Sequence, residues 1–215
     1  MTFKRIFIII LIYFSFFGLI YSQQFYKITC SFTIKEKLGD DKFFLSKGTA
    51  SYDKYLNETV LEFSFPSKEN WILTSDSLYK IIDNKVVFRQ EASFLIDYSI
   101  FRLFLNGTLK NYGFKNSLYQ IKNIEVSENM ILITWEPPKE MIYQFGKVIT
   151  SQKDNKLIGV AFYNLENELI SKQVFSKYKN LNSLFFPTKI IQITYLDNKE
   201  NYKITTFDNI MLDDE

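Results

Sequence analysis

Residues 26–37 read YKITCSFTIKEK, and apolar and polar side chains alternate along them. Ile28, Cys30, Phe32 and Ile34 fall on one face of an extended chain, because successive side chains of a strand point to opposite faces. Such alternation is typical of an antiparallel sheet with one packed face and one face in water. The segment therefore predicts a half-buried strand of such a sheet.

The same period of two recurs through most of the remaining chain. Residues 43–52 and 59–65 continue it, with Leu61, Phe63 and Phe65 on one face of the second segment. Short polar turn sequences separate the segments, as they do in a meander of antiparallel strands. We expect about eleven strands in one large antiparallel sheet.

One segment near the middle of the chain has a different period. Over residues 91–105 apolar side chains recur every three to four positions, which predicts an amphipathic helix inserted into the mainly β chain. Phe101, Phe104 and Leu105 give this helix apolar groups on more than one side, so it could both pack on the sheet and cover its opening. Gly107 follows the segment and is typical of a helix C-terminus.

The N-terminal residues have the features of a secretory signal peptide. Lys4 and Arg5 precede an apolar run over residues 6–19, and a small residue closes the run at position 22. The run is too short for a relaxed membrane span. We therefore expect residues 1–22 to be removed on export and residues 23–215 to form one domain. An uncleaved N-terminal anchor is the alternative.

Charge and composition exclude several classes of function. The predicted signal peptide contains two of the 26 basic residues and no acidic residue, so its removal leaves 24 basic and 24 acidic residues. The net charge is then about zero, and nucleic acid is not an expected partner. The chain has no histidine, which excludes a Ser-His-Asp triad and most zinc sites. Its single cysteine, Cys30, cannot form an internal disulfide. We expect no catalytic activity, cofactor or metal.

Aromatic residues are abundant and leave two interpretations open. They make up 18% of the chain, with 22 Phe and 14 Tyr. Large flat side chains in this number can fill a thick core or line an apolar cavity. The sequence does not separate a packed interior from a cavity that receives a ligand.

Several short sequences carry a resemblance to a known family. They are Lys47-Gly48-Thr49, Phe63-Ser64-Phe65-Pro66 followed by Trp71, Ser75-Asp76-Ser77-Leu78-Tyr79-Lys80-Ile81-Ile82-Asp83, Trp135-Glu136-Pro137-Pro138 and Phe186-Pro187-Thr188-Lys189-Ile190. They occur in a long antiparallel meander that a helix interrupts. In this order of elements the chain from Tyr26 to Leu212 resembles the outer-membrane lipoprotein carrier superfamily, the LolA/LolB type.

The resemblance implies a half-open, incomplete antiparallel β-barrel with a helical lid. An apolar cavity between sheet and lid would receive the acyl chains of lipoproteins or another lipid. An inner-membrane releasing complex and an outer-membrane acceptor would be its further partners. The residues expected to line the cavity are Leu61, Phe63, Phe65, Trp71, Leu73, Phe101, Phe104, Leu105, Ile133 and Trp135.

Two features of the family are missing from the sequence. Only Gln23 and Gln24 separate the predicted signal peptide from the first strand, which leaves no room for an N-terminal helix. An arginine on an early strand, which would latch the lid, is also missing, since only Arg89 and Arg102 follow the signal peptide. The function that the resemblance implies is that of a periplasmic, noncatalytic carrier or chaperone for acyl chains. The alternative is an envelope protein-interaction module of the same fold with a filled core.

Overall fold

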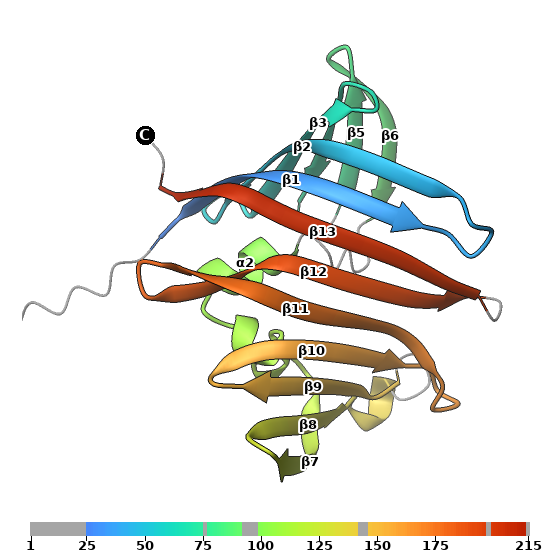
Figure 1. Ribbon diagram of the computed structural model, residues 1–215, viewed down its shortest axis with the longest axis vertical. Helices are drawn as coiled ribbons and strands as arrows, with labels where there is room; N and C mark the ends of the chain where they lie inside the picture. Colours follow the sequence, from blue (N-terminus) through green and yellow to red (C-terminus); the bar gives the residue numbers. More distant parts are fainter. Residues whose placement is uncertain (1–24, 75–76, 92–98, 142–145, 197–198, 214–215) are drawn as a thin grey trace, which may run out of the picture.

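The computed structural model describes residues 25–74, 77–91, 99–141, 146–196 and 199–213, and Figure 1 shows their arrangement. The predicted signal peptide lies outside these residues. Six strands precede the helix, namely β1 (Lys27–Lys37), β2 (Phe43–Asp53), β3 (Glu58–Phe65), β4 (Glu69–Leu73), β5 (Ser77–Ile82) and β6 (Lys85–Glu91). Seven follow it, namely β7 (Gln120–Ser127), β8 (Met130–Glu136), β9 (Val148–Lys153), β10 (Lys156–Tyr163), β11 (Leu169–Leu181), β12 (Leu184–Leu196) and β13 (Lys199–Leu212).

All these strands form one antiparallel sheet with the order β6-β5-β4-β3-β2-β1-β13-β12-β11-β10-β9-β8-β7. The first and last strands pair with each other in the middle of the sheet. Consequently the two edge strands, β6 and β7, are consecutive in the chain and lie at opposite ends of the sheet (Figure 1). The sheet is curved but not closed, which confirms the predicted half-open antiparallel barrel with a small inserted helix.

The predicted number of about eleven strands is too low, because the described sheet has thirteen. The short segments are strands of the sheet as well, since β4 pairs with β3 and β6 pairs with β5.

The structure differs from the predicted helix at Glu91, which belongs to a strand. Residues up to Glu91 belong to β6, and α2 spans Ser99–Leu105; residues 92–98 lie outside the described residues. The predicted C-terminus is confirmed. Gly107 has a positive φ of 67°, its N–H donates to the Phe104 carbonyl, and the Thr108 N–H donates to the Leu103 carbonyl. These two bonds form a Schellman motif, which ends the helix.

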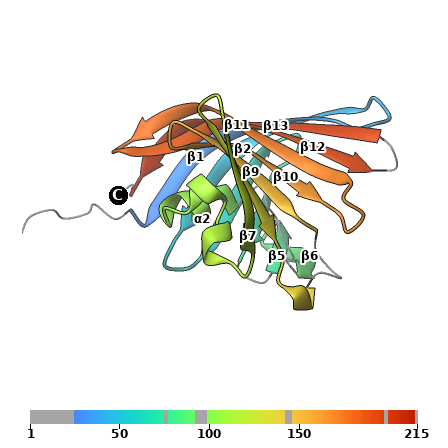
Figure 2. The same cartoon turned by 90° about the horizontal axis from the view of Figure 1, so that it is seen from below.

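α2 fills the centre of the concave face, and Figure 2 shows it beneath the curved sheet. Phe101 of α2 stacks on Phe186 of β12 with 5.8 Å between ring centroids, and its ring lies 5.3 Å from that of Phe207 of β13. Phe104 meets Phe186 edge to face at 5.0 Å. These side chains are all buried, so this aromatic cluster is the middle of the core.

Two short 3-10 helices extend the filling of the concave face towards β8. They are η2 (Leu109–Asn111) and η3 (Phe114–Asn116), and a third, η4 (Lys139–Met141), follows β8. Phe114 lies 5.8 Å from the buried ring of Trp135, measured between centroids. The Trp135 indole N–H donates to the Thr150 hydroxyl at 2.9 Å. The buried indole therefore has its hydrogen-bond partner within the core.

Candidate functional site

The concave face carries exposed apolar side chains at its β7–β8 end. Ile131 and Ile133 alternate with the core residue Trp135 along β8, so they point to the concave side. In β7, Val126 lies opposite Ile131 and Ile124 lies opposite Ile133, and directly opposed residues share a face. We name this surface the β7–β8 flank, and it consists of Ile121, Ile124, Val126, Ile131 and Ile133.

The exposure of the β7–β8 flank is large for apolar side chains. Ile121 is 51% exposed, Ile124 53%, Val126 73% and Ile131 37%. Side chains of α2 and η2 pack on the neighbouring centre of the face, Phe114 of η3 packs on Trp135 at the border of the flank, and Ile133 is the flank residue that packs against the core. A contiguous apolar surface on a concave face is typical of a site that binds an apolar ligand or partner.

A second apolar surface lies at the other end of the concave face. Trp71 of β4 lies opposite the buried Leu61 of β3, and its ring is 6.2 Å from that of Phe88, which is 42% exposed. Phe63 is half-buried and packs against the core, with its ring 5.1 Å from that of Phe32. We name Phe63, Trp71 and Phe88 the β3–β6 flank.

An ion pair lies beside the β3–β6 flank. The Lys80 ammonium is 2.7 Å from a carboxylate oxygen of Glu69 and 5.3 Å from the Trp71 ring centroid. The Trp71 indole N–H donates to the other oxygen of Glu69 at 2.8 Å. Partial burial opposes ionisation of Glu69, but hydrogen bonds from Lys80 and Trp71 outweigh it and lower the pKa of the carboxyl. The pair holds the indole in a fixed orientation.

The residues predicted to line the cavity occupy three environments. Leu61, Phe101, Phe104, Leu105 and Trp135 are buried in the core. Phe63, Trp71, Leu73 and Ile133 are half-buried, and Phe65 is 47% exposed. The structure thus brings Phe63 and Trp71 together on one flank and places Ile133 on the other. The ligand-binding role of the whole set stays a prediction.

The sequence analysis missed most residues of the exposed flanks. Ile124 and Val126 are two residues apart, so alternation alone puts them on a common face, whereas Ile121 joins that face only through an irregularity in the pairing between Ile121 and Asn123. Phe88 lies in the strand β6. Nothing local indicates that α2 and the 3-10 helices leave these positions uncovered, because that depends on residues distant in sequence.

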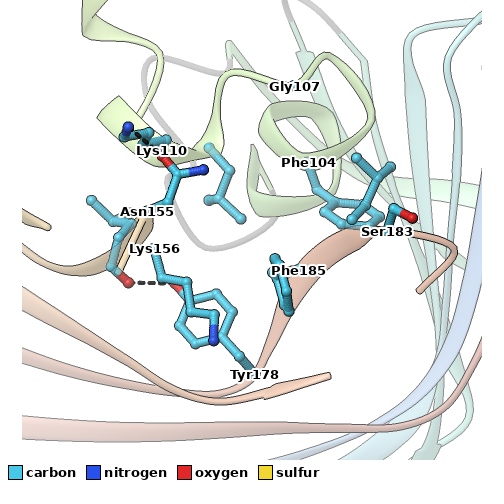
Figure 3. Close-up of a pocket in the computed structure, with 11 residues that line it drawn as sticks. Phe104, Gly107, Lys110, Asn155, Lys156, Tyr178, Ser183 and Phe185 are labelled. Atoms are coloured by element: carbon cyan, nitrogen blue, oxygen red, sulfur yellow. Dashed lines mark hydrogen bonds between the residues drawn. The ribbon is translucent and has the colours of Figure 1, made fainter. Parts of the chain in front are cut away.

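A separate pocket of about 180 Å³ lies where three turns of the chain meet (Figure 3). They are the α2–η2 turn with Gly107, the β9–β10 turn with Asn155 and the β11–β12 turn with Ser183. We call it the turn pocket. The side chains that line it are Phe104, Leu109, Lys110, Asn155, Lys156, Leu157, Tyr178, Ser183, Leu184 and Phe185.

The described part of the chain holds no group of three or more His, Cys, Asp and Glu side chains arranged to bind a metal ion. None of its helices has the length and apolar character needed to cross a membrane.

Several solved structures share this architecture. A LolA superfamily protein from Nitrosomonas europaea aligns over 90% of this chain and 88% of its own, with 14% identity and a TM-score of 0.61. A DUF1329 family protein from Desulfovibrio piger covers 89% and 87%, with 11% identity and a TM-score of 0.61. A putative outer membrane lipoprotein-sorting protein domain from Vibrio parahaemolyticus covers 87% and 85%, with 9% identity and a TM-score of 0.60. No protein-family model and no curated protein matches the sequence.

These likenesses extend over nearly the whole described chain at very low sequence identity. They show that the chain has the fold of the LolA superfamily, which confirms the predicted resemblance at the level of structure. The class defined by fold and surface is thus a half-open β-barrel with an apolar concave face.

Proposed function

We propose that this protein is a periplasmic, noncatalytic carrier or chaperone that binds acyl chains of lipoproteins, or another lipid, on its concave face. The observation that carries the proposal is the exposure of apolar side chains on that face, led by Ile124 at 53% and Val126 at 73%. A monomeric surface seldom leaves such side chains grouped in a concavity without a ligand or partner to cover them. The neighbour described as a lipoprotein-sorting protein domain supports the same class of ligand.

The chemistry of the two flanks suits hydrocarbon. Each methylene moved from water to an apolar surface contributes about 0.8 kcal/mol, so a long acyl chain could gain on the order of 10 kcal/mol before ordering costs. The β7–β8 flank offers aliphatic side chains, and the β3–β6 flank adds aromatic rings. In this proposal α2 is the fixed part of the lid, since it already packs into the core.

A direct test combines lipid identification with a matched pair of variants. The exported protein is purified from a membrane-containing host, its bound lipids are identified by mass spectrometry, and uptake of a fluorescent fatty acid is titrated. Ile131→Ser removes an apolar side chain that is 37% exposed on the concave face. Val174→Ser is the control, because Val174 is 39% exposed and its strand neighbours Gln173 and Phe175 are buried on the opposite, concave face.

We expect Ile131→Ser, combined with Ile124→Ser, to weaken fatty-acid uptake at least about tenfold, which corresponds to 1.4 kcal/mol. Val174→Ser should leave uptake unchanged. A protein that carries no lipid and takes up no fatty acid would refute the proposal. Equal loss in the concave and convex variants would show that the measured binding is nonspecific.

The filled centre of the concave face favours one alternative function. Phe101, Phe186 and Phe207 form a closed aromatic cluster, as a packed module without a ligand would need. In that case the exposed flanks would bind another envelope protein. The fatty-acid titration separates the two functions, because a protein-interaction module should not take up the fluorescent lipid.

Export and delivery belong to the same proposal. Cleavage at residue 22 would release a soluble shuttle that receives its cargo from an inner-membrane complex and passes it to an outer-membrane acceptor. Sequencing the N-terminus of the exported protein tests this step. An intact Met1 would indicate an anchored receptor instead.

A further inference from the structure

The turn pocket combines a basic rim with an apolar floor. Phe104, Leu109 and Leu157 are 3%, 7% and 1% exposed, so they belong to the core and form its base. Lys110 and Lys156 extend along its edge, as Figure 3 shows. A site of this composition differs from both concave flanks, whose side chains are almost entirely apolar.

The two lysines bring positive charge that nothing in the pocket neutralises. None of the side chains that line it is a carboxylate, and among the described residues neither Lys110 nor Lys156 forms an ion pair. Lys110 donates to the amide oxygen of Asn155, a neutral partner. The local field therefore favours an anion.

Aromatic rings hold one of these charges in place. The Lys156 ammonium is 4.4 Å from the ring centroid of Phe185 and 5.7 Å from that of Tyr178. Cation–π contacts of this kind orient the ammonium without removing its charge. The Tyr178 hydroxyl donates to the Leu157 carbonyl, which fixes the second ring (Figure 3).

The end of α2 does not oppose an anion here. Unpaired carbonyls at a helix C-terminus would repel negative charge. In this helix the carbonyls of Leu103 and Phe104 accept the two bonds of the Schellman motif, and the Leu105 carbonyl accepts from Lys54 at 3.1 Å. The carbonyls are already paired, so the lysines dominate the electrostatics of the pocket.

From these observations we infer that the turn pocket binds an anionic phosphate or carboxylate group carried on a short apolar segment. The anionic group would lie between Lys110 and Lys156, and the apolar segment would lie against Phe104 and Leu157. A volume of about 180 Å³ has room for a head group with a few carbons.

Calorimetric titration of the full chain with butyl phosphate tests this inference. Inorganic phosphate and 1-butanol are the partial probes, since each carries one half of the ligand chemistry. The variant is Lys110→Gln with Lys156→Gln, which removes both charges at exposed or half-buried positions and should not disturb folding. Lys172→Gln is the matched control, because its ammonium also lies over a ring, 5.7 Å from the centroid of Tyr195, but outside the pocket.

We expect butyl phosphate to bind at least about tenfold more tightly than either partial probe. The double variant should lose about tenfold or more in affinity, whereas Lys172→Gln should change it by less than about twofold. Added salt should weaken binding to the unsubstituted protein, since the rim is solvent-accessible.

Three results would overturn the inference. Butanol binding as tightly as butyl phosphate would show an apolar site, and inorganic phosphate binding as tightly would show a site for free anions only. Undiminished butyl phosphate binding by the double variant would place the ligand elsewhere. The Ile124→Ser/Ile131→Ser protein should still bind butyl phosphate normally, so failure of the carrier proposal and failure of this one are distinguishable.

Discussion

The centre of the concave face and its β7–β8 flank have the same alternating sequence pattern but opposite exposure. Phe186 in the centre is 0% exposed, whereas Ile124 and Val126 on the flank are 53% and 73% exposed. Both sets of side chains lie on one face of one continuous sheet. The comparison teaches that alternation determines which face is apolar, while another part of the chain determines whether that face is covered.

The cover differs because the described part of the segment between β6 and β7, residues 99–119, packs on the centre of the face and on the strands next to it. Its aromatic residues pack on β12 and β13 through Phe101, and on β8 and β11 through Phe114 and Tyr112. The flank beyond Trp135 has no such partner among the described residues. Substitutions in the two regions should therefore affect different properties.

The largest effect is expected for Phe186→Ala in the centre. Removal of this fully buried ring would leave a cavity among Phe101, Phe104 and Phe207, and such a change costs about 3–5 kcal/mol of unfolding free energy. Urea unfolding measures it. Phe185→Ala is the neighbouring control, because Phe185 is 45% exposed and should cost far less. Equal losses for the two would contradict the assignment of the core.

The reactivity of two cysteine thiols, one in the core and one introduced on the β7–β8 flank, allows the two regions to be compared in a single protein. Burial raises the pKa of Cys30 to about 12 from 9.0, so its reactive thiolate should be roughly a thousandfold scarcer than that of an ordinary cysteine. In a Val126→Cys protein, iodoacetamide at pH 8 should modify position 126 and spare Cys30. Peptide mass spectrometry reads both sites. Rapid modification of Cys30 in the folded protein would show that the centre opens readily.

Thr150→Val tests the polar contact at the border between centre and flank. The change preserves shape but leaves the buried Trp135 N–H without its acceptor, which should cost about 1–3 kcal/mol. Thr49→Val is the control, since the Thr49 hydroxyl donates to Glu62 on an exposed surface. Thermal unfolding of both variants measures the difference, and similar values would mean that the indole finds another acceptor.

The ion pair of the β3–β6 flank should give a small pH effect. The pKa of Glu69 is lowered on folding, so its stabilisation is present above the ordinary value of 4.5 and is lost as the pH falls through the lower folded value. Glu69→Gln should thus lower stability by at most about 1 kcal/mol at pH 7 and by less at pH 3. A difference that grows on acidification would reverse the sign and refute this account.

The smallest change in stability is expected on the β7–β8 flank. Ile124→Ser replaces a side chain that is 53% exposed, so the unfolding free energy should move by no more than about 0.5 kcal/mol. The same substitution is expected to reduce lipid uptake. A loss of stability like that of Phe186→Ala would show that the flank is part of the packed core.

The fold could be predicted from the sequence to a considerable extent. The period of two identified the half-buried strands, and the change of period together with Gly107 located the end of α2 correctly. The expected count of about eleven strands fell short of the thirteen in the described sheet, and Glu91, expected in the helix, belongs to β6, because strand pairing decides where such segments end. The sequence identified Leu61, Phe101 and Trp135 as apolar positions, but it did not show which side chains they contact in the core.

The turn pocket shows the limit of sequence analysis for sites. Lys110, Asn155 and Ser183 lie in unrelated turns, and each turn alone looks like an ordinary solvated loop. Only the pairing of β9 with β10 and of β11 with β12, with α2 against the sheet, brings them together. No local sequence pattern indicates that these three turns lie next to one another.

By itself the sequence determined that this protein is a large antiparallel sheet with one apolar face and an inserted helix, because side-chain periodicity is a local property of the backbone. Tertiary structure alone decided where the helix lies on that face, which apolar side chains stay in contact with water and which turns adjoin. Those outcomes depend on contacts between residues far apart in the chain, and periodicity carries no information about them.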